Sequence, residues 1–215
     1  MTEFSLQDAR TWYNDDDPVH DFAHIERVFH MATRLAMKEK ANLRIVQTAA
    51  LLHDAEGSAP GKDKSARAKH HLDSAEFAKQ ILESAGWTAD DISAVQHCIR
   101  AHRFRSGLEE PSTIEAKVLF DADKLDVLGA VGAARTIAYA VLDHMPVYSE
   151  VSQHFVDTGK EEPGEKHSSY HEYIFKLRKV KDRLYTPSAI EIAKDRHAFL
   201  EEFYEQLRKE MRSEV

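Results

Sequence analysis

The spacing of the apolar residues is the feature that most constrains the fold of this chain. Over long stretches they recur every three or four positions, which is the period of an amphipathic helix and not of a strand. Glycine and proline, which interrupt helices, number only 8 and 6 among 215 residues. The sequence therefore predicts an all-α protein. One such stretch holds Phe22, Ile25, Val28, Phe29, Ala32, Leu35 and Ala36.

Breakers and capping residues divide this pattern into separate helices. Asn42 and Thr88 are expected to cap two of them, and Ser112 with Glu115 has the spacing of a capping box. The stretches 57–69 and 145–167 hold glycine and proline and are expected to be irregular. We expect helices over roughly 5–13, 21–40, 42–53, 70–85, 88–102, 114–128, 129–144, 169–184 and 186–211.

The length of the chain fits one well-packed domain, and no internal repeat or linker divides it. We expect a single-domain helical bundle over residues 1–215, with its core motifs in 20–140. The last two helices form a C-terminal extension over about 168–212. This pair either packs on the same domain or forms a homodimer contact.

Charge and composition exclude several classes of function. The net charge of −8 argues against a nucleic-acid surface, although it leaves room for a small phosphorylated substrate. No apolar run approaches the roughly 18 to 20 residues of a membrane span, and no secretory signal is recognisable, so we expect no membrane association. The single cysteine, Cys98, fits a reducing compartment. A cytoplasmic protein is expected.

Candidate metal ligands occur on three of the predicted helices. His53 and Asp54 stand side by side after the apolar pair Leu51-Leu52, with His24 upstream and Asp123 downstream in apolar helical surroundings. A helical bundle builds metal sites in its core from separate helices in this way. Two imidazoles and two carboxylates suit Mn, Fe, Co, Ni or Zn better than Ca. The alternative is that the four are isolated buried polar groups.

A metalloprotease interpretation of His20 and His24 is less favourable. The pair has the spacing of His-Glu-x-x-His, but Asp21 stands in place of the glutamate and no third ligand follows at a suitable distance. His20 also lies beside a turn, where it need not be helical.

The four candidate ligands and their neighbours resemble the HD-domain superfamily of metal-dependent phosphohydrolases. The similarity covers about residues 20–140 and is closest to the small stand-alone bacterial members. It implies that His24, His53, Asp54 and Asp123 bind a divalent ion, one per chain, drawn from Mn, Co, Ni, Fe, Mg or Zn. The matching strings are His24 to Val28, Ala50 to Asp54 and Asp121 to Asp126.

The same resemblance implies hydrolysis of a phosphate ester or anhydride bond in a small phosphorylated metabolite. A nucleotide is the expected substrate, cleaved by a nucleotidase or a nucleoside triphosphate pyrophosphohydrolase. Asp54 and Glu56 are the candidate catalytic residues. Glu56 is a candidate general base, and a hydrogen-bond acceptor beside the metal ligands is the alternative. Candidate substrate contacts are Arg27, His102 and Lys124. An ion pair with Asp54 is the alternative for Arg27, and a surface role is the alternative for Lys124. The loop cations Lys62, Lys64 and Arg67 either close over a polyphosphate or are simply solvated.

Two further points stay open at this stage. His71, His97 and His102 either complete a second metal site that shares Asp54, as in binuclear HD proteins, or pack within helices. The alternative functions are a di-iron oxygenase of HD type and a non-catalytic nucleotide-binding domain. Gly57 and Ser58 replace the Glu-Asp pair of the guanosine tetraphosphate hydrolases, which argues against that substrate.

Overall fold

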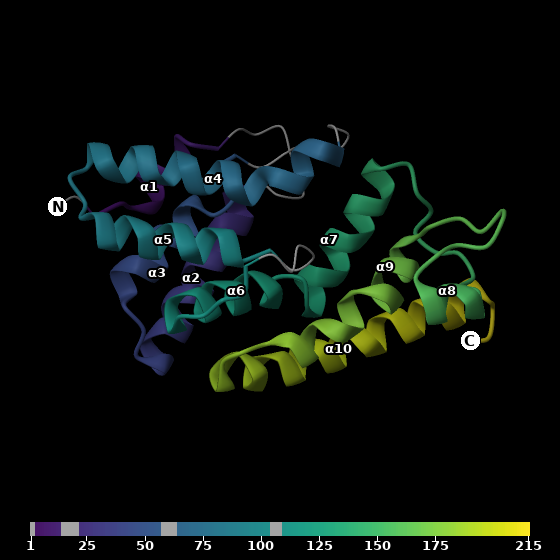
Figure 1. The fold of residues 1–215 in the computed structure, drawn as a ribbon. Helices are drawn as coiled ribbons and strands as arrows, with labels where there is room; N and C mark the ends of the chain where they lie inside the picture. The colour runs from purple at the N-terminus through teal and green to yellow at the C-terminus, as the bar shows by residue number, and fades with distance from the viewer. Residues whose placement is uncertain (1–2, 14–21, 57–63, 104–108) are drawn as a thin grey trace. The chain divides into compact units, whose positions relative to one another are not determined.

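The computed structural model describes residues 3–13, 22–56, 64–103 and 109–215. Helices account for 71% of the structure, and no strand occurs among the described residues, which confirms the all-α prediction. Figure 1 shows the helices α1 (Leu6–Arg10), α2 (Phe22–Glu39), α3 (Leu43–Leu52), α4 (Lys64–Ser84), α5 (Ala89–Ala101), α6 (Ile114–Leu125), α7 (Gly129–Leu142), α8 (Gln153–Thr158), α9 (Ser169–Phe175), the 3₁₀ helix η1 (Leu177–Arg183) and α10 (Pro187–Met211).

The chain forms two compact units. Unit 1 comprises Met1–Asp123 together with Tyr185–Ala189, and unit 2 comprises Lys124–Leu184 together with Ile190–Val215. Both α6 and α10 run from one unit into the other. This division does not distinguish one domain from two, so the single-domain organisation stays a prediction.

Unit 1 is a helical bundle in which α3 is central. It packs against α2 and α5, and α4 lies along α5 (Figure 1). The central position explains why α3 is apolar on nearly all sides, since a helix covered all round reads as a continuous apolar run. Its buried residues are Ile45, Val46, Thr48, Ala49, Ala50, Leu51 and Leu52.

The predicted caps of two helices in unit 1 are confirmed. The Asn42 side chain accepts hydrogen bonds from the N–H groups of Arg44 and Ile45 at the start of α3. Thr88 accepts from the N–H of Asp91 at the start of α5. These side chains satisfy backbone donors that have no partner within the helix.

The predicted Ser112–Glu115 capping box is wrong, because both side chains bind distant partners instead. Ser112 contacts His97 Nε2 through its N–H and hydroxyl, at 3.2 and 3.0 Å. Glu115 accepts from the N–H of Asn42. Thr113 caps α6, since its hydroxyl accepts from the N–H of Ala116. Tertiary contacts thus override the local pattern.

Helix α4 begins at Lys64, six residues before the predicted start at His70. The segment between these positions is rich in alanine, lysine and arginine, which are strong helix formers. The charged residues that suggested a loop therefore extend the helix. The earlier start places His70 inside a helix and not at its end.

Unit 2 contains α7 to α9, η1 and most of α10. A Cβ atom at Gly132 would lie 2.2 Å from the Val127 carbonyl oxygen, so this position requires glycine. The predicted helix over 169–184 is instead divided into α9 and η1. Leu177 and Val180 are both buried, and the period of three in a 3₁₀ helix places them on one face.

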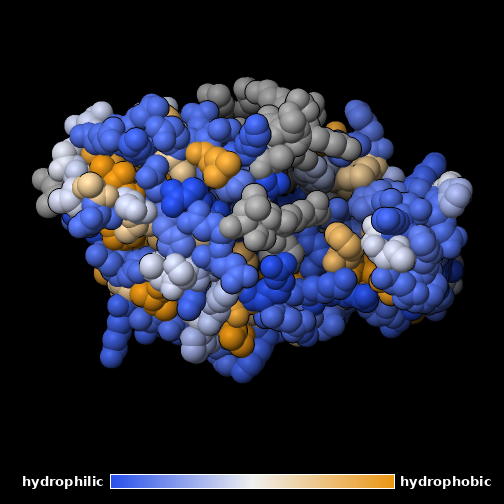
Figure 2. Space-filling model, in the orientation of Figure 1, coloured by the Kyte–Doolittle hydropathy of each residue, from blue (hydrophilic) through white to orange (hydrophobic). Residues whose placement is uncertain are grey.

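Among the described residues no single helix is long and apolar enough to cross a membrane, although α6 and α7 as a bent pair meet the criterion by length and composition. On the face in Figure 2, hydrophilic residues predominate and hydrophobic residues form small separate patches. Isolated exposed apolar residues of this kind are normal and need no special explanation.

Candidate metal centre

The four predicted ligands, His24, His53, Asp54 and Asp123, come together in unit 1 and are called the metal cluster below. His24 lies in α2, His53 and Asp54 follow α3, and Asp123 lies in α6. His24 Nε2 is 3.6 Å from Asp123 Oδ1 and 3.8 Å from Asp54 Oδ2. His53 Nε2 is 3.6 Å from Asp54 Oδ2. Residues nearly 100 positions apart in the chain thus share one centre.

The orientation of His53 follows from its place at the end of α3. It is the C-cap residue, and its Nδ1 lies 2.8 Å from the Ala50 carbonyl oxygen. A ring nitrogen facing a carbonyl must carry the proton, so Nδ1–H donates and Nε2 keeps its lone pair. The helix end therefore directs a ligand atom into the cluster.

His102 repeats this arrangement at the end of α5. It is also a C-cap residue, and its Nδ1 lies 2.5 Å from the Ile99 carbonyl oxygen. Its Nε2 lies 3.4 Å from Asp54 Oδ1. Two helices thus end on a buried histidine that satisfies a terminal carbonyl and presents Nε2 to the same aspartate.

The cluster has two polar atoms without a hydrogen-bond partner among the described residues. His53 Nε2 and Asp54 Oδ1 are buried and have no hydrogen-bond partner within the described part of the chain. Burying such atoms unpaired is costly, and native structures seldom do so without a reason. Ligand atoms about 2.0–2.2 Å from a metal are roughly 3.0–3.4 Å apart, close to the spacing observed here. The residues fit a divalent ion.

Protonation favours the same interpretation. Burial lowers the pKa of His53 to about 4, so its imidazole is neutral near pH 7. Burial alone would raise the pKa of Asp54, but the neighbouring His53 and His102 outweigh it and hold that pKa well below its usual range. A neutral imidazole beside a carboxylate is the form that binds a metal.

A second group of possible ligands shares Asp54. Asp54, His70 and His102 each present a ligand atom within 4.8 Å of the others, as do His24, His53 and Asp123 in the first group. His70 Nε2 is 3.5 Å from Asp54 Oδ1. The two oxygens of Asp54 therefore face different histidines, with Oδ2 toward the first group and Oδ1 toward the second.

The other two histidines considered for a second metal lie differently. Both ring nitrogens of His97 are engaged, Nδ1 by Glu109 at 2.6 Å and Nε2 by Ser112 at 3.0 Å. His71 is buried next to His70, and burial lowers its pKa to about 4. Its Nδ1 has no hydrogen-bond partner among the described residues.

The predicted substrate and catalytic residues differ in exposure. Arg27 is half-buried on α2, one turn after His24. Lys124 is only 7% exposed, which is unlike a surface lysine. Glu56 is exposed, while its N–H donates to Ser74 Oγ and fixes the backbone there. The side chains of the loop cations Lys62, Lys64 and Arg67, and also His20, lie outside the described residues.

Sequence reasoning missed two residues of this region. The sequence predicts only that His70 begins a helix, and no pattern distinguishes it from His71. Tyr13 donates a hydrogen bond to the Leu51 carbonyl oxygen at 2.8 Å, near the end of α3 that carries His53 and Asp54. The contact joins residues 38 positions apart, so no local signal reveals it.

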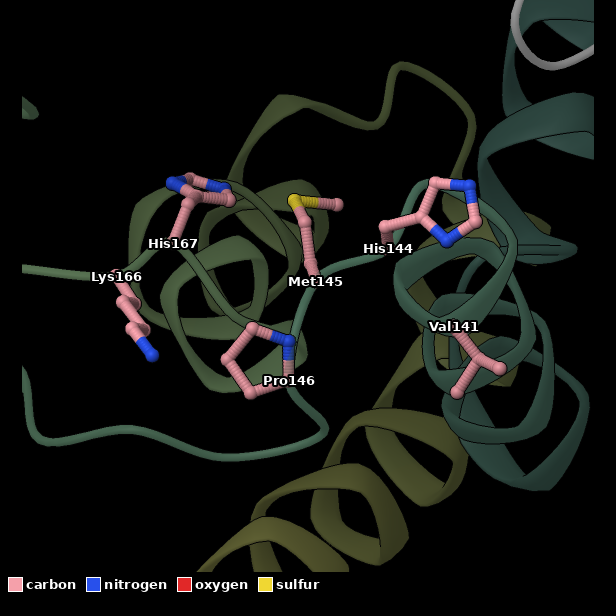
Figure 3. Close-up of a pocket in the computed structure, with 6 residues that line it drawn as sticks. All are labelled: Val141, His144, Met145, Pro146, Lys166 and His167. Atoms are coloured by element: carbon pink, nitrogen blue, oxygen red, sulfur yellow. The ribbon is translucent and has the colours of Figure 1, made fainter.

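A hollow in unit 2 is a separate feature. It has a volume of about 670 Å³, and Figure 3 shows Met145 between His144 and His167 in that view. It contains no carboxylate and none of the predicted site residues, so we do not assign the chemistry to it. Its lining residues are Val141, His144, Met145, Pro146, Lys166 and His167.

Comparison with known proteins agrees with this geometry. Residues 21–128 match the HD domain family, and the chain belongs to that family. It is 32% identical over 212 residues to the uncharacterized protein YpgQ of Bacillus subtilis (strain 168), covering 95% of this chain and 93% of YpgQ.

Solved structures of relatives share the fold over nearly the whole chain. The crystal structure of Bacillus subtilis YpgQ in complex with ADP has a TM-score of 0.71 at 32% identity, covering 96% of this chain and 97% of that one. An HD-superfamily hydrolase from Bacillus thuringiensis has a TM-score of 0.68 at 29% identity, covering 96% and 94%. The chain therefore resembles proteins described as HD-superfamily hydrolases, as its sequence predicted.

Proposed function

We propose that this protein is a metal-dependent phosphohydrolase that cleaves a phosphate ester or anhydride bond of a nucleotide. The observation that carries the proposal is the metal cluster, in which His53 Nε2 and Asp54 Oδ1 are buried without a partner among the described residues. ADP bound to YpgQ supports a nucleotide as ligand. Both a nucleotidase and a nucleoside triphosphate pyrophosphohydrolase fit these observations.

His24, His53, Asp54 and Asp123 would hold one divalent ion, with Mn, Co, Ni, Fe, Mg and Zn as candidates. When bound, such an ion polarises a phosphoryl oxygen and lowers the pKa of water from 15.7 toward roughly 7. The neutral imidazole of His53 and the ionised carboxylate of Asp54 are already in the protonation states required.

The remaining roles belong to residues around the cluster. His102, with Nδ1 committed to Ile99, would contact a phosphoryl oxygen through Nε2. Arg27 and Lys124 would offset the negative charge that develops on the transferred group, and this is the main catalytic requirement of phosphoryl transfer. Glu56, exposed two residues after Asp54, would accept a proton from the attacking water.

A product assay tests the proposal. The protein is incubated with nucleoside mono-, di- and triphosphates in Mn²⁺, Mg²⁺, Co²⁺ or Ni²⁺, and both phosphate and pyrophosphate are measured. Pyrophosphate from triphosphates identifies a pyrophosphohydrolase, and phosphate from monophosphates identifies a nucleotidase. If neither phosphate nor pyrophosphate is released with any of the metals, the proposal is contradicted.

Asp54→Ala with a matched control completes the assay. Substitution of a residue that only orients a metal ligand lowers metal affinity or activity about 10–100-fold. Asp54 is a proposed ligand itself, so we expect its loss to reduce the rate at least about 100-fold. Asp195→Ala removes an exposed carboxylate from α10 and should leave the rate unchanged. Full activity of Asp54→Ala would exclude the assigned centre.

The shared carboxylate of Asp54 favours one alternative function. The group Asp54, His70 and His102 provides ligands for a second ion beside the first, as a di-iron oxygenase requires. Two irons per chain together with oxygen consumption would support that alternative. ADP binding without turnover under every metal would support a non-catalytic nucleotide-binding role.

A further inference from the structure

Asp121 is a buried carboxylate that the proposed chemistry does not use. Its side chain is fully buried in α6, two residues before Asp123. It accepts three hydrogen bonds: from the N–H of Tyr185 at 2.9 Å, and from the N–H and hydroxyl of Thr186 at 2.7 and 2.6 Å. All three residues belong to unit 1.

The partners of Asp121 make its burial hard to explain by stability alone. The three donors are two backbone N–H groups and the Thr186 hydroxyl, and all of them are neutral. A buried carboxylate held by neutral donors is often no more stable than an apolar replacement. Such groups instead select one arrangement of the elements that they join, because any other arrangement leaves a charge unsatisfied.

The arrangement selected here concerns the rotation of α6. Residues two positions apart on an α-helix differ by about 200°, so Asp121 and Asp123 point to nearly opposite sides. Asp123 Oδ1 lies 3.6 Å from His24 Nε2, whereas Asp121 binds the segment Tyr185–Ala189. A small rotation of α6 would break the bonds of Asp121 and move Asp123 away from His24.

The segment Tyr185–Ala189 is itself fixed, which makes it a suitable anchor. The N–H of Ser188 donates to Glu39 at the end of α2 at 2.9 Å. The ring of Tyr185 packs edge-on against Phe120 of α6, with centroids 5.1 Å apart. Thr186 and Ala189 are buried. Pro187 then starts α10, and its fixed φ angle restricts the backbone at this point.

We infer that Asp121 is a positioning residue that fixes the rotation of α6 against Tyr185–Thr186 and thereby places the Asp123 carboxylate for metal binding. The inference rests on the proposed function, since it assumes that the metal cluster binds an ion. It adds a residue outside that cluster whose loss weakens metal binding without removing a ligand.

Glu39 provides a matched control. Its carboxylate accepts from Ser188 in the same Tyr185–Ala189 segment. Glu39 lies at the end of α2, 15 residues after His24, and Asp123 lies on a different helix. Glu39→Ala should therefore reduce stability while leaving the three hydrogen bonds of Asp121 in place. A purely structural role for Asp121 predicts the same outcome for both variants.

The test is a calorimetric titration of the metal-free protein with Mn²⁺, together with the thermal unfolding midpoint without metal. We expect Asp121→Asn to weaken Mn²⁺ binding about 10-fold, in the range typical of residues that orient ligands. Thr186→Val, which removes only the hydroxyl bond, should weaken it less and in the same direction. Glu39→Ala loosens the anchor segment but keeps all three hydrogen bonds of Asp121, so it should weaken Mn²⁺ binding less than Asp121→Asn does.

The outcomes separate this inference from the proposed function. Unchanged Mn²⁺ affinity in Asp121→Asn, with a wild type that binds, overturns the positioning role and leaves the proposed function intact. A wild type that binds none of the divalent ions overturns both. If Asp121→Asn does not fold, Thr186→Val decides, and an affinity equal to wild type overturns the role.

Discussion

Two histidine clusters in this molecule look alike in composition and differ in how their polar atoms are satisfied. In the metal cluster of unit 1, His53 Nε2 and Asp54 Oδ1 have no hydrogen-bond partner among the described residues. Unit 2 contains a second cluster, called the His–Glu network below, in which both nitrogens of each ring are engaged. Its members are Glu161, Glu165, His167, Ser168, His171 and Glu172.

The His–Glu network is closed by short contacts. His171 is fully buried, with Nδ1 2.8 Å from Ser168 Oγ and Nε2 3.0 Å from Glu165. Glu165 also accepts from the N–H groups of Ser152 and Glu162, and these bonds lower its pKa to about 2. Fully satisfied networks of this kind rigidify a structure. The comparison teaches that unpaired ligand atoms, and not histidine content, distinguish a candidate metal site from a closed hydrogen-bond network.

Among the substitutions that test this contrast, His171→Ala is expected to change the free energy of unfolding most. The change leaves Ser168 and Glu165 without their buried partner, and we expect a loss of about 2–3 kcal/mol in the free energy of unfolding. Mn²⁺ affinity should not change. Chemical denaturation and calorimetry measure the two effects, with His154→Ala, an exposed histidine of α8, as control. Loss of metal binding in His171→Ala would break the contrast.

A smaller effect concerns pH and His167. The hydrogen bond with Glu172 raises the pKa of His167 above 6.5, and the bond with Glu161 adds to it against the effect of burial. Because the folded pKa is the higher one, the stabilisation is complete below about pH 6.5 and is lost as pH rises through the folded value. Unfolding midpoints between pH 6 and 9 should fall more for wild type than for His167→Gln. Equal slopes would contradict this.

The smallest effect is expected from Tyr13→Phe in unit 1. It removes the hydroxyl that donates to the Leu51 carbonyl and also interacts with the backbone of Asp54. The bond to Leu51 stabilises the end of α3 by roughly 0.5–1.5 kcal/mol. Since the ring still packs against Phe22, we expect a small drop in unfolding free energy and little change in metal affinity. A drop above about 3 kcal/mol would show that Tyr13 does more than satisfy a carbonyl.

Much of the fold was predictable because it depends on local pattern. The period of the apolar residues predicted the helices. The predicted N-caps Asn42 and Thr88 are confirmed. The errors came from contacts between distant residues. Ser112 binds His97 and not its own helix, and the buried pair Leu177 and Val180 favours a 3₁₀ helix that periodicity did not anticipate.

The candidate ligands were predictable from the sequence, but the residues around them were not. The sequence predicted His24, His53, Asp54 and Asp123 as metal ligands, and the structure brings these four side chains together. The sequence did not predict a site role for His70, because the direction of its side chain depends on where α4 begins. Asp121 was equally hidden, because its partners are 64 and 65 positions away in the sequence. We propose ligand roles for the four residues of the metal cluster and a positioning role for Asp121.

Metal binding by the metal cluster is the central claim, and titration of the metal-free wild type with Mn²⁺ tests it most directly. We predict one tightly bound ion per chain, at least about 100-fold weaker binding in Asp54→Ala, and unchanged binding in Asp195→Ala. Absence of binding in the wild type, or equal affinity in Asp54→Ala, would contradict the account.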